Sequence, residues 1–161
     1  GEITNGQGQI IIISGHEENP SLQQRADGFN REISISYPQI NNLGIRYAYD
    51  DDWVAEKITD EILDKYPNLK GIYITGSGVL GVCKSLQKAN KIKDIKIIAN
   101  DFINDNIQLL SNGTINFLIG QDAYTQGYQS IMLLFHKLFD NKNPDSKFAY
   151  TDIVIKNRFN I

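Results

Sequence analysis

The first stretch with residue types suited to chemistry is GIYITGSGVLG, residues 71–81. It has the pattern G-x-G-x-x-G directly after an apolar run, and Asp101 follows about 20 residues later, as in dinucleotide-binding turns. Under that hypothesis Gly76 forms the tight turn and Gly78 lets a pyrophosphate approach the backbone. Gly81 then permits close helix packing, and Asp101 binds the ribose. The pattern raises the hypothesis of a nicotinamide-dependent enzyme.

Other features of the chain argue against a dinucleotide site. The glycine turn does not follow the first apolar run, and the chain beyond Gly81 has no room for a catalytic domain. Glycine makes up 13 of the 161 residues, so a chance match is not improbable. The alternative is a strand-to-helix turn whose glycines adopt positive φ. A Walker-type phosphate loop is also disfavoured, because no Lys-Ser or Lys-Thr follows the glycines.

The remaining candidates for catalysis or metal binding are isolated from one another. His16 follows the first predicted strand and could face a ligand or simply be solvated, whereas His136 falls in an amphipathic segment and is interpreted as structural. Asp50–Asp52 precede a helix, where carboxylates are more often caps than metal ligands. Cys83 lies beside apolar residues and is interpreted as part of the core. We therefore expect no catalytic residues, no metal and no cofactor.

A different group of polar and aromatic residues follows the carboxyl ends of successive predicted strands. It comprises Arg25, Trp53, Gly76, Ser77, Asp101 and Gln121. In a parallel sheet those ends meet at one edge, where open α/β sheets bind ligands. Arginine and aspartate can share hydroxyls as donor and acceptor, glutamine can do both, and tryptophan offers a flat apolar face. The group predicts binding of a sugar or polyol without chemistry, although Arg25 could instead form a surface ion pair and Trp53 could be a core residue.

Strand-like and helix-like segments alternate along the chain with short loops between them. The apolar patterns predict strands over 9–14, 44–49, 71–75, 95–99, 115–119 and 152–156, and helices over 21–34, 53–66, 79–88, 105–110 and 124–139. Ser21 is expected to cap the first helix, with Gln24 as its capping-box partner. The alternation predicts a single α/β domain with a three-layer parallel sheet flanked by helices.

Composition is that of a globular domain, with 41% hydrophobic and 22% charged residues. The net charge is −3, and no basic stripe is present, so the chain by itself is a poor candidate for nucleic-acid binding. No apolar run approaches the ~18 residues of a membrane span, and no membrane association is expected.

Several motifs resemble, in order, the sugar-binding core of lactose-repressor (LacI/GalR) regulators, a core shared with type I periplasmic sugar-binding proteins. The most specific are QRADGF at 24–29, the Asn-Asp pair at 100–101, and IGQD at 119–122 followed by QGY at 126–128. The resemblance implies one lobe of a type I periplasmic-binding-protein-like fold over residues 1–161. This lobe would be the second of two joined by three crossovers, and the chain would be part of a longer protein.

The resemblance also assigns roles to individual residues. Arg25 and Asp101 would bind sugar hydroxyls, Gln121 would bind at the final crossover, and Trp53 would stack on the sugar. Many members carry Asn-Asp after the third strand and use that asparagine as a ligand, whereas this chain has Gly76-Ser77. The departure puts the choice of sugar in doubt.

The implied function is the effector-binding part of a LacI-type transcriptional regulator, not an enzyme. The protein would be cytoplasmic and a homodimer, would bind a small carbohydrate between its lobes, and would contact DNA only through an N-terminal helix-turn-helix outside this chain. A periplasmic sugar-binding protein or a sensor domain is the alternative. Residues 122–141 would be a helix of the first lobe, so its apolar residues Ile131, Leu134 and Leu138 should pack against a second copy, or the helix should stand away from the sheet.

Overall fold

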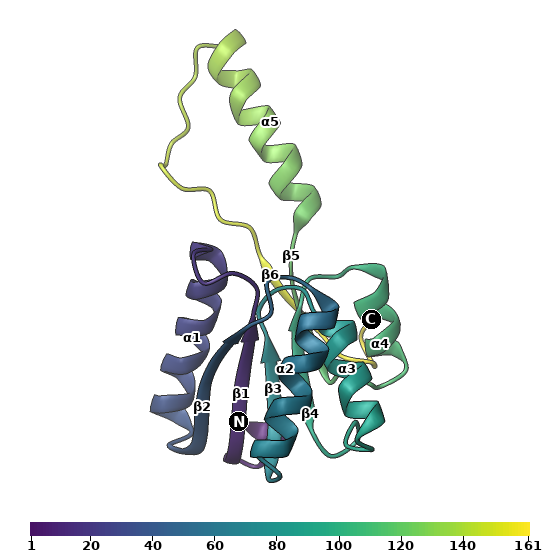
Figure 1. Ribbon diagram of the computed structural model, residues 1–161. Helices are drawn as coiled ribbons and strands as arrows, with labels where there is room; N and C mark the ends of the chain where they lie inside the picture. The colour runs from purple at the N-terminus through teal and green to yellow at the C-terminus, as the bar shows by residue number, and fades with distance from the viewer.

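The computed structural model describes residues 1–161 and shows one six-stranded sheet with helices on both faces, as the sequence predicts (Figure 1). The elements in order are η1 (Glu2–Thr4), β1 (Gln7–Ser14), α1 (Pro20–Ser36), β2 (Gln39–Tyr47), α2 (Asp52–Lys65), β3 (Leu69–Ile74), α3 (Val79–Lys88), β4 (Lys96–Asn100), α4 (Asn104–Ser111), β5 (Phe117–Gln121), α5 (Ala123–Phe139) and β6 (Ile153–Lys156). Each predicted strand and helix is present, with ends that differ by a few residues.

The strand order is β2-β1-β3-β4-β5-β6, and the first five strands are parallel. The expectation of a wholly parallel sheet is wrong for β6, which pairs antiparallel with β5 and places Ile153 opposite Gln121. The physical reason is the path of the chain. β5 ends at the carboxyl edge of the sheet, α5 extends from that edge, and the returning chain must therefore enter β6 from the same edge.

The core lies mainly between the sheet and the helices α2 and α3. The isoleucine run of β1 is buried on both faces, as expected for a central parallel strand. Ile11 and Ile13 enter the main core, whereas Ile12 packs on the α1 side with Ala26 and Tyr73. Cys83 is also buried in the main core, as the sequence predicts.

The first helix starts earlier than predicted. Asn19, not Ser21, is the N-cap, and its side-chain oxygen accepts from the backbone N–H groups of Ser21 and Leu22. Pro20 occupies the first helical position, where its fixed φ suits a helix and its missing N–H is not needed. The pair Asn19-Pro20 therefore starts the helix two residues upstream of the predicted N-cap Ser21.

The glycine turn after β3 is explained by helix packing. Gly78 caps α3 with a positive φ of 95°. A Cβ on Gly81 would lie 1.9 Å from the carbonyl oxygen of Asp52, so only glycine permits this approach of α3 to α2. The glycines of this turn thus allow α3 to pack closely on α2. This agrees with the alternative hypothesis of a strand-to-helix turn, except that Gly76 does not have a positive φ.

Helix α5 stands away from the sheet. None of its residues is buried, and Figure 1 shows it extending beyond the carboxyl edge, with the returning chain beside it. This is the second of the two arrangements that the sequence suggests. Its assignment to another lobe stays a prediction. No helix of the chain combines the length and the apolar character needed to cross a membrane.

Candidate functional site

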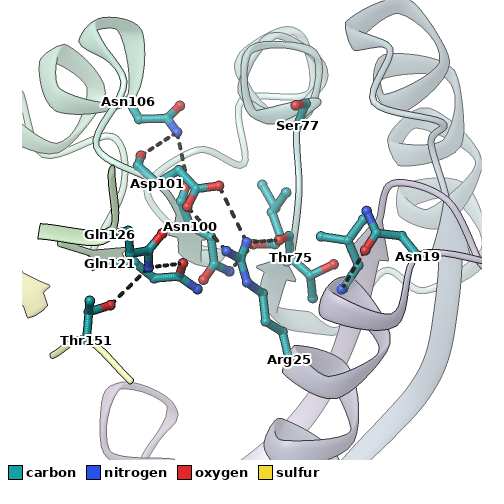
Figure 2. Close-up of polar contacts among 12 residues, drawn as sticks. Asn19, Arg25, Thr75, Ser77, Asn100, Asp101, Asn106, Gln121, Gln126 and Thr151 are labelled. Atoms are coloured by element: carbon teal, nitrogen blue, oxygen red, sulfur yellow. Dashed lines mark hydrogen bonds and ion pairs between the residues drawn. The ribbon is translucent and has the colours of Figure 1, made fainter. Parts of the chain in front are cut away.

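The carboxyl edge of the sheet brings Arg25 and Asp101 together. Arg25 lies in the second turn of α1, and its guanidinium Nη1 donates to the carbonyl oxygen of Thr75 at 2.6 Å (Figure 2). The guanidinium also reaches both carboxylate oxygens of Asp101, at 3.3 and 3.4 Å. The Asp101 side chain is 50% exposed and that of Arg25 is 19% exposed. The Thr75 carbonyl therefore orients the arginine, while the pair itself stays open to solvent.

The backbone of Asp101 is held in an uncommon conformation. Its φ is 71°, in the left-handed region, and its N–H donates to the carbonyl of Ile119 at 2.8 Å. The buried side chain of Asn106 donates from Nδ2 to the carbonyl oxygens of Asn100 and Asp101, at 3.0 and 3.1 Å. These bonds from β5 and α4 support a strained position. They aim the Asp101 carboxylate at Arg25.

Asn100 fixes the strand end beneath the pair. Its buried side-chain Nδ2 donates to the carbonyl oxygen of Ile74 at 2.8 Å and to the hydroxyl of Tyr73 at 3.2 Å. Burial raises the pKa of Tyr73, and the hydrogen bond from Asn100 opposes that rise only partly. Tyr73 therefore stays a neutral phenol at pH 7, and its ring stacks on Phe29 at 4.6 Å between centroids.

Two cavities meet around these residues. The turn cavity, of about 320 Å³, lies between the β3–α3 turn and the start of α4; its polar lining includes Asp50, Asp52, Ser77, Asn100, Asp101 and Asn106. The sheet cavity, of about 410 Å³, lies beside α1 over the last strands; its lining includes Arg25, Tyr73, Asn100, Ile119, Gln121 and Ile153. Asn100 belongs to both linings, and the Arg25–Asp101 pair joins a residue from each. The two cavities together form one candidate site.

Gln121 lies at the end of β5, where the chain leaves the sheet for α5. Its side-chain oxygen accepts from Nε2 of Gln126 at 2.9 Å, and the same Nε2 reaches the hydroxyl of Thr151 at 3.0 Å (Figure 2). Gln121 is exposed and lines the sheet cavity with Arg25. Side chains thus tie the end of β5 to α5 and to the returning chain, and the bond to Gln126 uses the amide oxygen of Gln121 and not its amide nitrogen.

The turn after β3 presents Ser77 rather than a larger amide. Ser77 is exposed and lines the turn cavity together with Gly76. Its backbone N–H donates to Oδ1 of Asp50 at 3.0 Å, which holds the turn in place. Ser77 and Asp101 therefore line the same cavity.

Trp53 and His16 lie near this edge but line neither cavity. Trp53 is the second residue of α2 and is 66% exposed, so it is not a core residue. The ammonium group of Lys57 lies 5.6 Å from its ring centroid. His16, in the loop after β1, packs its ring edge-on against Tyr49 at 5.3 Å. The structure leaves both rings outside the group formed by Arg25 and Asp101.

Three residues of the site are not identified as binding residues by sequence reasoning. Asn100 and Asn106 act from buried positions, and no local pattern separates a buried asparagine from a surface one. The sequence favours a cap over a metal ligand at Asp50, whereas the structure places it in a left-handed turn with φ 58°, where its Oδ1 accepts from the N–H of Ser77. Its neighbours do cap: Asp51 accepts from the N–H of Val54, and Asp52 accepts from the N–H of Gly81.

The chemistry of the site is that of hydrogen bonding. Carboxylates, side-chain amides and a hydroxyl line the turn cavity, and the guanidinium of Arg25 lines the sheet cavity. No histidine or cysteine lines either cavity, and no group of three or more His, Cys, Asp or Glu residues is placed to hold a metal ion. The arrangement offers both donors and acceptors to a neutral polar ligand.

Solved structures that share this fold include solute-binding proteins. One from Burkholderia graminis, in complex with D-arabinose, has a TM-score of 0.92 and 24% identity, covering 99% of this chain and 56% of its own. One from Agrobacterium vitis, bound with α-D-tagatopyranose, has a TM-score of 0.91 and 21% identity, covering 99% and 53%. One from Actinobacillus succinogenes, with bound D-allose, has a TM-score of 0.90 and 21% identity, covering 99% and 55%. The chain thus spans about half the length of these proteins.

Sequence comparison agrees with the likeness in fold. No curated protein matches the chain. The profile of the periplasmic binding protein domain matches residues 1–142, which include the lining of both cavities except Ile153 and Ile155. The mostly parallel sheet with helices on both faces is one lobe of that fold. On these grounds the chain belongs to the periplasmic binding protein domain family.

Proposed function

We propose that this chain binds a small carbohydrate at the carboxyl edge of its sheet, without chemistry. The observation that carries the proposal is the Arg25–Asp101 pair, whose charged groups are oriented by buried contacts but left open to solvent. A surface ion pair of this kind contributes only about 0–1 kcal/mol to stability. Its orientation by Thr75 and Asn106 is therefore better explained by a ligand than by folding.

The two cavities suit a pentose or hexose in size and in chemistry. Their volumes, about 320 and 410 Å³, lie in the range of small-molecule pockets. Arg25 would donate to ring or hydroxyl oxygens, Asp101 would accept from two hydroxyls, and Gln121 would do either. Ser77 would supply one hydroxyl where relatives carry an asparagine. Because a serine side chain is shorter than that of asparagine, we expect room here for a sugar with a larger or differently oriented substituent.

The biological setting that we propose is solute binding for transport or sensing. The family match and the sugar-bound solute-binding proteins of the same fold support this setting. A second lobe would cover the site, and ligand binding would favour the closed arrangement of the two lobes. Aromatic stacking by Trp53 and a contact from His16 would then depend on closure, because neither ring lines the cavities of this lobe.

The LacI-type regulator is the second candidate, supported by the motifs QRADGF, IGQD and QGY. In that setting the protein would be cytoplasmic, and the sugar would alter DNA affinity through a separate helix-turn-helix. The sequence of the full-length protein separates the two settings. A helix-turn-helix would favour regulation, whereas a secretion signal would favour transport or sensing.

Calorimetric titration of the full-length protein with a panel of aldopentoses, aldohexoses and ketohexoses tests the binding proposal. Arg25→Ala should weaken the best ligand at least tenfold, because a charged hydrogen-bond donor is lost from a partly buried site. Arg31→Ala is the matched control, since Arg31 lies exposed on the same helix and lines neither cavity. Equal affinity of the Arg25 variant and the wild type would place the site elsewhere.

A further inference from the structure

The side chains that line the turn cavity include four carboxylates and no cation. The carboxylates belong to Asp50, Asp52, Asp101 and Asp105, and no lysine, arginine or histidine is part of the lining. Arg25 reaches Asp101 from the sheet cavity, whereas the other three aspartates have no ion-pair partner among residues 1–161. The turn cavity therefore carries an excess of negative charge.

The bonds within the chain use only part of this acceptor capacity. Oδ1 of Asp50 accepts from the N–H of Ser77, and Oδ1 of Asp52 accepts from the N–H of Gly81, so the second oxygen of each carboxylate stays free. The first turns of α3 and α4 also border the cavity. Each helix N-terminus contributes only about half a positive charge, which does not balance three carboxylates. The site therefore favours a ligand that brings donors and positive charge.

Asn106 adds a buried acceptor that has no donor. This residue is 2% exposed and lines the turn cavity, and its Nδ2 donates to the carbonyls of Asn100 and Asp101. Its Oδ1 is the one buried side-chain nitrogen or oxygen of the chain without a hydrogen-bond partner. Figure 2 shows this oxygen on the side of Ser77, turned away from the two carbonyls. A buried acceptor without a donor is costly, and this chain itself buries Asn106, so the missing donor must come through the cavity.

The arrangement of the carboxylates suits an organic cation rather than a metal ion. A calcium or magnesium ion draws its oxygen ligands to about 2.0–2.6 Å, and no three His, Cys, Asp or Glu residues are placed to hold one. The carboxylates instead surround a cavity of about 320 Å³, which admits part of a small organic molecule. A protonated amine supplies three N–H donors and one positive charge. It therefore meets both requirements of the site.

We propose that the carbohydrate bound by this chain carries an amino group, and that the protonated amine lies in the turn cavity. The amine would donate to Oδ1 of Asn106, while the neutral hydroxyls of the sugar would meet Arg25 and Gln121 in the sheet cavity. Ser77 lines the turn cavity with a short side chain, which leaves room for the amine. The inference rests on the proposed carbohydrate binding and narrows the ligand class to amino sugars.

Calorimetric titration of the full-length protein with pairs of sugars tests the inference. Each aldopentose, aldohexose and ketohexose is compared with its monoamino-deoxy analogues, which carry the amine at each position in turn. At least one analogue should bind about tenfold or more tightly than its neutral parent, because charge-assisted hydrogen bonds replace neutral ones. This advantage should shrink at high salt, since the carboxylates are exposed.

Asp105→Asn tests whether the charge of the turn cavity causes the advantage. Asp105 is exposed in the first turn of α4, so the variant should stay folded. The ratio of the affinity for the aminated sugar to that for its parent should fall about two- to fivefold, the effect of one exposed charge pair. Asp94→Asn is the matched control, because Asp94 is exposed and lines neither cavity. The control should keep the wild-type ratio.

The possible results separate failure of this inference from failure of the proposed function. If neutral sugars bind and Arg25→Ala weakens them, but no aminated analogue binds more tightly than its parent, the amine inference is wrong and carbohydrate binding stands. An advantage of the aminated sugar that Asp105→Asn leaves unchanged would place the amine elsewhere, and would also overturn the inference. If neither neutral nor aminated sugars bind, the proposed function itself fails.

Discussion

Arg25 and Asp101 are 76 residues apart in the chain, yet Nη2 of the arginine lies 3.3 Å from Oδ1 of the aspartate. The two side chains come from α1 and from the end of β4, on opposite sides of β3. The carbonyl of Thr75, directly after β3, accepts from the same guanidinium. Residues that directly follow β3 and β4 thus hold one arginine of α1, and the half-exposed carboxylate beside it is the group that a polar ligand would meet first.

The left-handed backbone at Asp101 separates the stability role of this residue from its binding role. Asp101→Asn should change the free energy of unfolding by less than about 1 kcal/mol, because asparagine tolerates positive φ and only a surface ion pair is lost. The same substitution should weaken ligand binding, because the charged acceptor is gone. Asp101→Val should destabilise the fold by about 1–3 kcal/mol, because a β-branched residue is strained at φ 71°. Urea unfolding of the two variants distinguishes these effects, and equal destabilisation by both would contradict the assignment.

The close approach of α3 to α2 makes Gly81 sensitive to the smallest side chain. A Cβ would lie 1.9 Å from the carbonyl oxygen of Asp52, which is backbone and cannot move aside cheaply. Gly81→Ala should therefore destabilise the protein by about 1–3 kcal/mol, measured by thermal or urea unfolding. Gly28→Ala is the matched control, since Gly28 lies in α1 with open space around its Cβ position. That change should stabilise the fold by roughly 0.5–1 kcal/mol, and loss of stability there would weaken the packing argument.

The elements were predictable from sequence because their patterns are local. The isoleucine run predicts β1, and its residues are buried in the sheet. The helical spacing of Val54, Ile58 and Ile62 predicts α2, and these residues are buried or partly buried. Parallel order then places Arg25 and Asp101 at one edge, so their meeting was also within reach of sequence reasoning. Sequence reasoning also placed Trp53 with them, whereas the structure leaves it outside both cavities. A position at the edge of the sheet does not set the direction of a side chain.

The details that sequence reasoning missed depend on contacts between distant segments or on competing local signals. The hydrogen bond from the N–H of Ser77 to Asp50 accompanies left-handed backbone conformations at Tyr49 and Asp50. No sequence pattern near these residues predicts those conformations. The role of Asn106 depends on the position of β4 relative to α4. The first helix offered two good caps, Asn19 and Ser21, and the proline between them decided the choice.

The buried carboxylate of Glu56 should make stability depend on pH in the acid range. Lys84 and Lys88 bind its two oxygens, and these hydrogen bonds lower its pKa below the ordinary value of 4.5. A lowered pKa means that the folded state releases the proton more readily than the unfolded state. The stabilisation of the folded state by ionised Glu56 is therefore complete above about pH 4.5. It is lost as the pH falls through the lower pKa that Glu56 has in the folded state.

Glu56→Gln should remove much of this acid-side slope. The measurement is the free energy of urea unfolding at pH 7 and at several values below 4.5. Glu61→Gln, at an exposed position on the same helix, is the control and should retain the wild-type slope. A wild-type slope in the Glu56 variant would show that the bonds to the two lysines do not contribute.

Cys83 should be unreactive in the folded protein. Its thiol is buried in the core, and burial, followed by the negative charge of Asp52, raises its pKa to about 12. Little thiolate is present at pH 8, and a disulfide reagent cannot reach the sulfur. One thiol per chain should therefore react only after unfolding in urea. Stoichiometric labelling of the native protein within minutes would contradict the placement of α3.

The most direct test of carbohydrate binding at this edge is a titration of the ¹⁵N-labelled chain with the sugars of the panel, followed by NMR. Weak binding by a single lobe is visible in such spectra. The account predicts that one sugar class shifts the backbone signals of Ser77 and Asp101 and the side-chain signals of Arg25 and Gln121, and that Asp101→Asn reduces these shifts. Shifts confined to residues far from the two cavities, or no shift with any sugar, would contradict it.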